Sequence, residues 1–260
     1  MSKNILKKLN IKKSNHKIKN QKRRNKKNDF DDKDRIIDDN SQFQTIESYN
    51  TLRTNIMFSL PKSETGKKII ITSASPAEGK TTTCINLAIT FAKMGLKVLV
   101  IDCDLRKPKV HRYLKLDRDK GVSNVLCGFE EFDKTINRNV RKNLDVITSG
   151  EVPSNPAEII SSEEFSKMLS EAERIYDYIF IDSPPVSVVA DAVVMSEECS
   201  GIIIVVRQDV TNLDLLDETI ESLEKSSTKI IGITMIADES SNSGKSYGRY
   251  KYKYRYEYRE

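Results

Sequence analysis

The chain has 260 residues, of which 38% are hydrophobic and 31% are charged, and its formal net charge is +5. This length and apolar content suit one well-buried α/β domain with two polar ends. No apolar run approaches the roughly 18–20 residues that cross a bilayer, and the basic start of the chain lacks the apolar core of a signal peptide. We therefore expect a cytoplasmic protein, whose four cysteines, without paired or metal-ligand spacing, stay reduced.

The positive charge lies at the two ends of the chain. Residues 1–27 hold 12 Lys and Arg and no acidic residue, and residues 244–260 hold six basic and two acidic residues. The part between these ends has 25 basic and 36 acidic residues, a net charge of −11. The basic character therefore belongs to the ends and not to the folded body.

Residues 1–40 contain almost no apolar residue that could join a core, which predicts a disordered polybasic segment. One interpretation is that residues 3–27 bind an anionic membrane surface, since each charge near the lipid contributes about 1 kcal/mol. A second interpretation is a solubilising tail without a partner. Nucleic acid is not expected as a partner, because no aromatic residue stands among these charges before Phe30.

Residues 41–240 are predicted to form the folded domain. A first helix is expected over residues 47–60, where Tyr49, Leu52 and Ile56 follow helical spacing. Apolar runs without polar alternation predict buried strands at 68–73, 97–102, 144–149, 178–182, 201–206 and 229–236. Helical stretches are predicted at 81–95, 163–176 and 213–226. Strands of this kind joined through helices indicate an α/β fold, with a mostly parallel sheet covered by helices on both faces.

The segment ASPAEGKTTT, residues 74–83, lies between the first predicted strand and the helix that follows it. A loop in this place points backbone N–H groups into one concavity at the positive end of the helix dipole, which suits phosphate. Gly79 allows the backbone to approach closely, Lys80 can reach the β- and γ-phosphates, and the Thr81 hydroxyl can ligate Mg²⁺. Ala74 departs from the strict G-x-x-x-x-G-K-[ST] pattern, but the strand and helix around the loop still predict a P-loop NTPase fold that binds ATP and Mg²⁺.

Three aspartates follow predicted strands. Asp102 and Asp104 come at the end of the strand 97–102, and Asp182 ends the strand 178–182. Ligands of open parallel sheets bind beyond the carboxyl ends of the strands, so these carboxylates should converge with the loop. One carboxylate there can hold Mg²⁺ or its waters, and a second can accept the proton of an attacking hydroxyl.

Four ordered blocks of the chain resemble the bacterial tyrosine kinases, cytoplasmic autokinases associated with capsular and exopolysaccharide production. These blocks are IIITSASPAEGKTTTCINLAITFAKMGLKVLVIDCDLRKPKVH, ITSGEVPSNPAEIISS, YDYIFIDSPPVSVVADAVV and GIIIVVRQDVT. The resemblance runs from about residue 47 to residue 233 and includes the three phosphate and metal motifs in the family's order. It implies an ATP-dependent protein-tyrosine kinase whose P-loop fold is unrelated to that of eukaryotic protein kinases.

The resemblance also implies roles for the site residues. Lys80 would bind phosphate, Thr81 and Asp104 would serve the Mg²⁺ shell, and Asp182 would hold the ion through water. Asp102 is the candidate for orienting or deprotonating the incoming tyrosine, and the roles of Asp102 and Asp104 can be exchanged. The nucleotide-binding set is Ser75, Ala77, Glu78, Gly79, Lys80, Thr81, Thr82 and Arg207.

The chain departs from the family pattern at two positions. The family assembles into rings through a helix bearing Glu-x-x-Arg-x-x-Arg, which here reads Glu47, Asn50 and Arg53, so only the two outer charges remain to pair across subunits. Relatives usually place an asparagine near Ile236, where it can help to read adenine. Arg106 is expected either to place phosphate or to form a structural salt bridge.

Residues 241–260 are predicted to form a flexible tail. Six of the chain's ten tyrosines stand in it as the expected phosphoacceptors: Tyr247, Tyr250, Tyr252, Tyr254, Tyr256 and Tyr258. Each phosphate adds about −1.5 to −2 charge, so modification would turn a positive tail negative. An extended tail of 17 residues reaches on the order of 50 Å, far enough to enter a neighbouring subunit's site. An edge strand and an RNA-stacking segment are the alternatives.

Two other functions are compatible with the phosphate loop. A partitioning-type regulatory ATPase would carry an extra lysine five residues before the loop lysine, where this chain has Ser75. A nucleotide-gated scaffold at the membrane would need ATP binding but no phosphotyrosine.

A chain without a membrane span resembles the two-component form of the family. This resemblance implies a transmembrane activator of the polysaccharide co-polymerase type and recruitment to the inner face of the plasma membrane. It also implies a phosphotyrosine phosphatase as a further partner.

Overall fold

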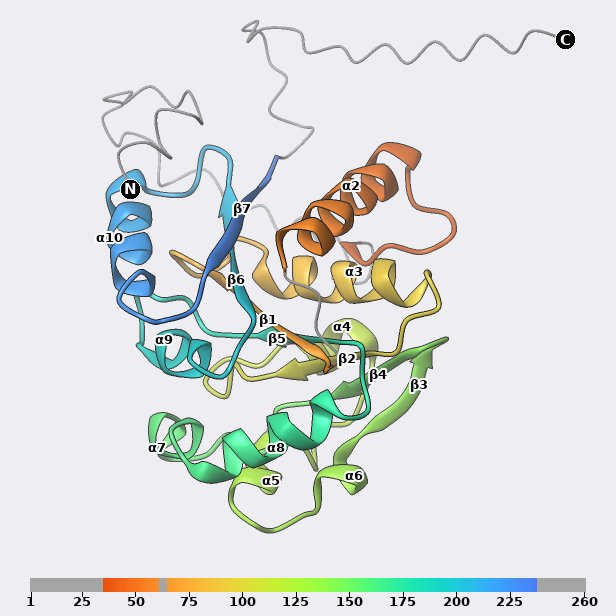
Figure 1. The fold of residues 1–260 in the computed structure, drawn as a ribbon, viewed down its shortest axis with the longest axis vertical. Coiled ribbons are helices and arrows are strands. Elements are labelled where there is room, and N and C mark those ends of the chain that lie inside the picture. The colour runs from red at the N-terminus through yellow and green to blue at the C-terminus, as the bar shows by residue number, and fades with distance from the viewer. Residues whose placement is uncertain (1–34, 61–64, 238–260) are drawn as a thin grey trace, which may run out of the picture.

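A seven-stranded sheet with helices on both faces forms the described part of the chain (Figure 1). The computed structural model describes residues 35–60 and 65–237. Most of the predicted polybasic segment (residues 1–34 of 1–40) and the whole tyrosine tail therefore lie outside the described residues. The strands are β1 (Lys67–Ser73), β2 (Val98–Asp102), β3 (Asn137–Arg141), β4 (Leu144–Ile147), β5 (Tyr178–Asp182), β6 (Gly201–Arg207) and β7 (Ile230–Ile236). The helices are α2 (Phe43–Ser59), α3 (Lys80–Ala92), α4 (Val110–Leu114), α5 (Val122–Leu126), α6 (Phe132–Thr135), α7 (Pro156–Ile160), α8 (Glu163–Glu173), α9 (Asp191–Ser196) and α10 (Leu213–Leu223).

The strand order is β3-β4-β2-β5-β1-β6-β7, and every neighbouring pair is parallel except β3 with β4. This confirms the predicted α/β fold with a mostly parallel sheet. The strands are apolar throughout because both faces are covered. Ile69 and Ile71 of β1 pack into the core beneath α2 and α3, whereas Ile70 between them packs into the core beneath α5 to α9. A third cluster packs α10 against β6.

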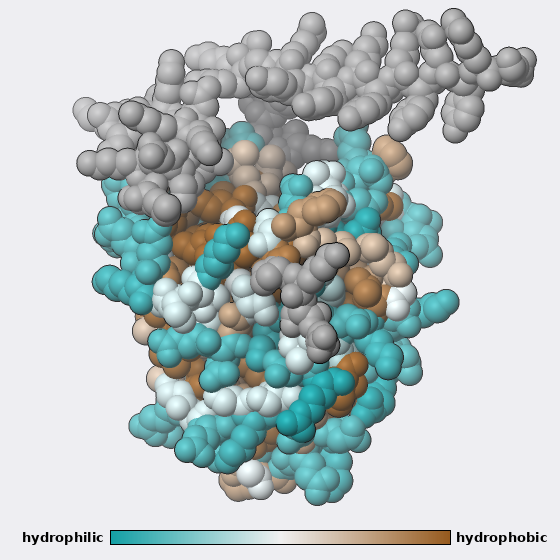
Figure 2. All heavy atoms as spheres, viewed as in Figure 1, coloured by the Kyte–Doolittle hydropathy of each residue, from teal (hydrophilic) through white to brown (hydrophobic). Residues whose placement is uncertain are grey.

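β3 was not predicted, and its sequence explains why. The segment NRNVR has no apolar run, and as the antiparallel edge strand it buries little of its side-chain surface. The opposite edge strand, β7, is only half-buried, and Met235 on it is exposed. On the face drawn in Figure 2 most of the surface is hydrophilic, and a hydrophobic area lies between α10 and β7. In the described part of the chain, no helix has the length and apolarity that crossing a membrane requires.

The folded domain includes residues before the predicted boundary at residue 41. Ile36 and Ile37 are 6% and 3% exposed and join the core beneath α2 and α3. The Asn86 side chain of α3 accepts a hydrogen bond from the Ile37 N–H (2.9 Å) and donates one to the Arg35 carbonyl (3.0 Å). Arg141 of β3 donates to the Ile37 carbonyl at 2.8 Å. Two isoleucines among many charges gave too weak an apolar signal to place this strap, residues 35–38, in the folded domain.

Asn86→Ala is expected to lower the free energy of unfolding by about 1–3 kcal/mol, because the buried Ile37 N–H would lose its acceptor. Urea unfolding of the full chain measures the loss. Asn55→Ala, which changes an exposed asparagine on α2, is the matched control and should shift stability by less than about 0.5 kcal/mol. Equal losses in the two variants would show that the strap adds nothing to stability.

Candidate active site

The phosphate loop connects β1 to α3 and is held in a conformation that few residues adopt. Ala77 has φ +67° and Gly79, at the amino end of α3, has φ +94°. A positive φ at a residue with a Cβ is strained, and such strain is concentrated at functional sites. The first N–H groups of a helix have no acceptor within the helix, so the amino end of α3 presents free donors and a positive dipole to a phosphate.

Glu78 closes the loop from within. Its fully buried carboxylate accepts a hydrogen bond from the Ser75 N–H (2.9 Å) and another from the Thr211 hydroxyl (2.6 Å). Thr211 in turn accepts from the Arg207 N–H at 2.8 Å, and the Arg207 guanidinium donates to the Ala77 carbonyl at 3.4 Å. The side chain of Glu78, a residue of the predicted nucleotide-binding set, therefore holds the loop together. Thr211 ends the block GIIIVVRQDVT, but it was missed as a site residue because its contact with Glu78 spans 133 residues of the chain.

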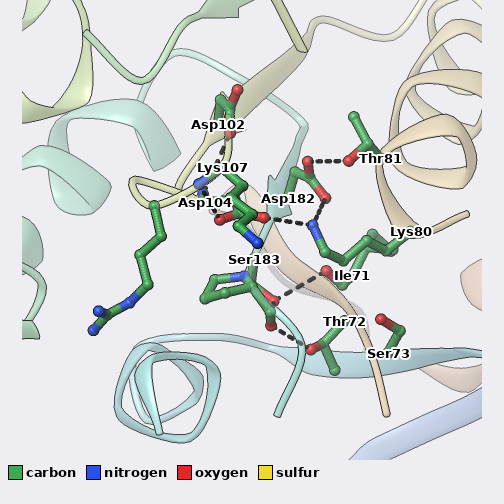
Figure 3. Close-up of polar contacts among 12 residues, drawn as sticks. Ile71, Thr72, Ser73, Lys80, Thr81, Asp102, Asp104, Lys107, Asp182 and Ser183 are labelled. Atoms are coloured by element: carbon green, nitrogen blue, oxygen red, sulfur yellow. Dashed lines mark hydrogen bonds and ion pairs between the residues drawn. The ribbon is translucent and has the colours of Figure 1, made fainter. Parts of the chain in front are cut away.

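Lys80 lies between two carboxylates at the mouth of the loop (Figure 3). Its Nζ is 2.8 Å from Asp104 Oδ2 and 3.7 Å from Asp182 Oδ1. The Thr81 hydroxyl donates to Asp182 Oδ2 at 2.7 Å. The structure thus brings together the lysine, the threonine and two of the three aspartates that the sequence singled out.

Asp102 lies beside Asp182 but faces the backbone of the following loop. The two residues end the adjacent strands β2 and β5 and are partners in the register. Asp102 accepts hydrogen bonds from the N–H groups of Asp104 (3.3 Å) and Val110 (3.1 Å), and it is fully buried. Asp104 is also tied to this loop, since it accepts from the Lys107 N–H at 3.0 Å.

The packed charges shift one another's protonation. Burial alone would lower the pKa of Lys80, but the attraction of Asp182, Asp104 and Asp102 outweighs it and raises that pKa to about 12. Burial, and then repulsion from Asp182, raises the pKa of Asp102 well above its ordinary value. Burial also raises the pKa of Asp182, and Lys80 opposes that rise. The lysine is therefore a permanent cation, and Asp102 and Asp182 hold their protons more tightly than usual.

The donor set fits Mg²⁺ held together with a nucleotide. Mg²⁺ keeps several waters and takes one or two carboxylates plus substrate phosphates. Asp182 Oδ1 is buried and has no hydrogen-bond partner among the described residues, and the other oxygen of this carboxylate meets Thr81. Asp182 and Thr81 can thus face the ion and its waters, with Asp104 close by.

Other predicted residues lie near the site with different contacts. Arg106 makes a two-point contact with the buried Asp191 of α9, at 3.2 and 3.4 Å, which supports the structural salt bridge. Thr82 is half-buried on the first turn of α3. Ile236 packs over Gly79, so that a Cβ added to Gly79 would lie 2.4 Å from Ile236 Cδ1. A cavity of about 380 Å³ opens beside Ile236, and its wall is formed by Gln44, Thr45, Ser48, Tyr49, Leu52, Thr83, Thr234, Met235, Ile236 and Ala237.

Gly79→Ala is expected to weaken ATP binding at least about tenfold. The new methyl group would meet Ile236 and occupy a backbone with φ +94°, which costs about 1–2 kcal/mol for a residue with a Cβ. Gly95→Ala is the matched control, because φ is +88° there and no atom lies within 4 Å of the added Cβ. Titration with ATP should show normal affinity for Gly95→Ala, and equal affinities for both variants would remove the close-approach role of Gly79.

The three residues of the predicted ring motif contact one another within one subunit. Asn50 donates to Glu47 at 2.7 Å, and its amide oxygen accepts from Arg53 at 3.1 Å. Arg53 also donates to the Thr90 carbonyl of α3 at 3.2 Å. Asn50 therefore joins the two outer charges in the place of the missing arginine.

Comparison with known proteins places the chain in a family. A family model described as an AAA domain matches residues 66–233. Tyrosine-protein kinase YwqD of Bacillus subtilis is 38% identical over 204 residues, which is 78% of this chain and 85% of the relative. Putative tyrosine-protein kinase CapB of Staphylococcus aureus is 34% identical over 78% of this chain and 90% of its own. The kinase domain of Escherichia coli tyrosine kinase ETK aligns with a TM-score of 0.72 at 30% identity, covering 78% of this chain and 80% of that one. With relatives of this kind over most of its described length, the chain belongs to the bacterial tyrosine kinases.

Proposed function

We propose that the protein is an ATP-dependent tyrosine autokinase that phosphorylates its own C-terminal tyrosine cluster and thereby regulates capsule or exopolysaccharide synthesis. The observation that carries the proposal is the position of Lys80, at the amino end of α3 and between Asp104 and Asp182. Phosphoryl transfer needs positioned positive charge more than covalent chemistry from the protein. This site supplies such charge beside carboxylates suited to a metal ion and a proton.

In the reaction, a tyrosine Oη attacks the γ-phosphorus of ATP, the bond to the β-phosphate oxygen breaks, and ADP leaves. Lys80 and the N–H groups of the first turn of α3 hold the charge that develops on the phosphate oxygens. Thr81 and Asp182 would hold Mg²⁺, which would neutralise charge on the β- and γ-phosphates. The phenol proton passes to a carboxylate, for which Asp102 is our first candidate because its raised pKa makes it a better base.

The cavity beside Ile236 is our candidate for the nucleobase. It adjoins the loop through Ile236 and Gly79, and it reaches α3 at Thr83. Tyr49, Leu52 and Ile236 offer apolar contact to a flat ring, and Thr83 offers a buried hydroxyl without a partner among the described residues. Apolar side chains and the polar groups of Gln44, Ser48 and Thr234 share the wall of this cavity. Ligand sites combine apolar contact with polar groups that fix the orientation of the ligand.

The expected partners follow from the same proposal. Self-association would allow one subunit's tail to enter another's site. A transmembrane activator would recruit the kinase to the inner face of the plasma membrane, where residues 3–27 could also meet anionic lipid, and a phosphotyrosine phosphatase would reverse the modification. Comparing membrane recruitment of the full chain with a deletion of residues 2–27 tests the lipid contact.

Asn50→Arg is expected to raise the molar mass of the protein in solution. The variant removes the bridge that joins Glu47 to Arg53 within one subunit, and it adds a second cation for a neighbouring subunit. Light scattering at several concentrations measures the mass. Asn55→Arg adds the same charge on the exposed side of α2 and is the control. Equal masses for both variants would separate this helix from self-association.

Mapping of phosphotyrosine by mass spectrometry tests the proposed function directly. The purified protein is incubated with Mg-ATP, with and without the cytoplasmic peptide of a candidate membrane partner. We expect phosphate on residues 247–258 in at least one condition. Intact nucleotide binding without any phosphotyrosine would sink the kinase proposal and leave a nucleotide-gated scaffold.

A further inference from the structure

A strongly basic segment borders the site. Residues 106–120 hold seven Lys and Arg and two Asp, although the chain between the two basic ends has a net charge of −11. The segment begins two residues after Asp104 and runs through α4. Hydrogen bonds anchor the segment to the carboxyl edge of the sheet near both ends. The Val110 N–H donates to the Asp102 carboxylate, and the Thr148 hydroxyl donates to the carbonyls of Asp117 and Lys120.

Four of the cations between these anchors form no ion pair within the described part of the chain. Arg106 and Lys120, near the ends of the segment, pair with Asp191 and Glu130. Between them lie the residues that we call the basic rim: Lys107, Lys109, Arg112, Lys115 and Arg118. In the described part of the chain, Lys107, Lys109, Lys115 and Arg118 have no carboxylate within ion-pair distance.

Three cations of the basic rim lie on the same exposed side of α4. Lys109, Arg112 and Lys115 are three residues apart along α4 and its two caps, so they share one exposed side of the helix. On the other side, Val110 is buried and Tyr113 packs against the core. Burial, Arg118 and Arg112 together lower the pKa of His111, which lies among them.

An unmodified tail does not suit such a surface, but a phosphorylated one does. Residues 244–260 have six basic and two acidic residues and would be repelled by the rim. Phosphates on the six tyrosines would change this net charge of +4 to about −5 to −8. Arg and Lys bind such dianions through charge-assisted hydrogen bonds.

The tail can reach the rim. β7 runs parallel to β2, so its last residue, Ile236, lies at the same edge of the sheet as Asp102. Three strands separate β7 from β2, which at about 4.8 Å per strand puts their ends roughly 20 Å apart. The ten residues up to Tyr247 span up to about 33 Å. The tail is therefore long enough to contact the basic rim of its own chain or of a neighbouring copy.

We propose that the basic rim binds the phosphotyrosines of the C-terminal tail, an inference that rests on the proposed function. A tail with its first phosphate is then held beside the site while further tyrosines react, and the product of one transfer becomes the docking group for the next. The rim selects modified tails over unmodified ones by the sign of their charge.

Titration of synthetic tail peptides tests the rim without any need for catalysis. The protein is the full chain carrying Lys80→Met, and the labelled peptides cover residues 244–260, one unmodified and one phosphorylated on Tyr254, Tyr256 and Tyr258. Fluorescence anisotropy should show at least about tenfold tighter binding of the phosphopeptide. Its affinity should fall steeply with added salt, because the contact is between exposed charges.

Two triple variants with the same charge loss separate the rim from a general charge effect. Lys109→Gln, Arg112→Gln and Lys115→Gln together should weaken the phosphopeptide at least about tenfold. Lys97→Gln, Arg174→Gln and Lys225→Gln remove three exposed cations near the amino ends of β2, β5 and β7 and should change affinity less than about twofold. Both variants are checked by thermal unfolding, and the salt dependence of the parent protein serves as a measure that needs no variant.

Three results would overturn the proposal: equal affinity for both peptides, equal losses in the two triple variants, or a rim variant that loses binding to phosphatidylglycerol vesicles but keeps the phosphopeptide. The last result would assign the rim to a lipid surface. Because the phosphates are synthetic, a failed titration refutes the rim alone. Missing phosphotyrosine after incubation with Mg-ATP refutes the proposed function instead.

Discussion

Lys80→Met should reduce phosphotyrosine formation by at least about 10³-fold. The ammonium group lies within ion-pair range of Asp104 and Asp182 at the amino end of α3, where a transferred phosphoryl group would gather charge. Removing one such group from a site sheltered from water commonly costs about 10²–10³ in rate, and here the substrate is itself an anion. Quantitative mass spectrometry of the tail during incubation with Mg-ATP gives the rate.

The same substitution should also change stability, and this effect separates electrostatics from catalysis. Without Lys80, the fully buried Asp182 loses its nearest cation, which should cost about 3–5 kcal/mol of unfolding free energy.

This loss of stability should depend on pH. Lys80 opposes the raised pKa of Asp182, so removal of Lys80 raises that pKa further. A raised pKa in the folded state means that stability is lost as pH rises above the ordinary value of 3.8. The deficit relative to the wild type should therefore be larger at pH 8 than at pH 5, and adding Asp104→Asn should restore part of the stability without restoring activity. A deficit that is the same at both pH values would contradict the coupling of Lys80 to Asp182.

Asp102→Asn should lower the rate of phosphoryl transfer by about 10²–10⁴ if this carboxylate takes the phenol proton. Burial and Asp182 raise the pKa of Asp102, so the wild-type rate should fall as pH drops through that raised value, because the base becomes protonated. The variant should lose this acid limb from its residual rate. Initial rates between pH 5 and pH 9, at saturating Mg-ATP, measure the profile.

Asp104→Asn is the matched comparison for Asp102→Asn. Asp104 contacts Lys80 and the Lys107 N–H, so its loss should raise the Mg²⁺ concentration needed for half-maximal rate and keep the acid limb. Asp102 also holds the N–H groups of Asp104 and Val110, so both variants need a thermal unfolding check. An acid limb that disappears only in Asp104→Asn would exchange the roles of the two aspartates.

The chemistry at the strand ends could be predicted from sequence, because its signals are local. A strand, a glycine-containing loop and a helix place Lys80 and Thr81, and the carboxyl ends of parallel strands place Asp102 and Asp182 at the same edge of the sheet. The strand order and the register of β2 with β5 were not predicted. The contacts that hold these groups could not be predicted. Glu78 meets Thr211 across 133 residues, and Asn86 meets Ile37 across 49, and neither pair shows a periodic pattern. β3 and the short helices were missed because an exposed edge or a five-residue turn needs few apolar residues.

The strap of residues 35–38 connects the beginning of the described domain mechanically to helix α3. Asn86 grips the backbone at Arg35 and Ile37, and it lies on α3 six residues after Lys80. A force applied to the chain ahead of Arg35 is therefore resisted at the middle of the helix whose amino end faces the phosphates, and also by β3 through Arg141. Tension at the beginning of the domain and binding of the nucleotide phosphates therefore act on the same helix, α3.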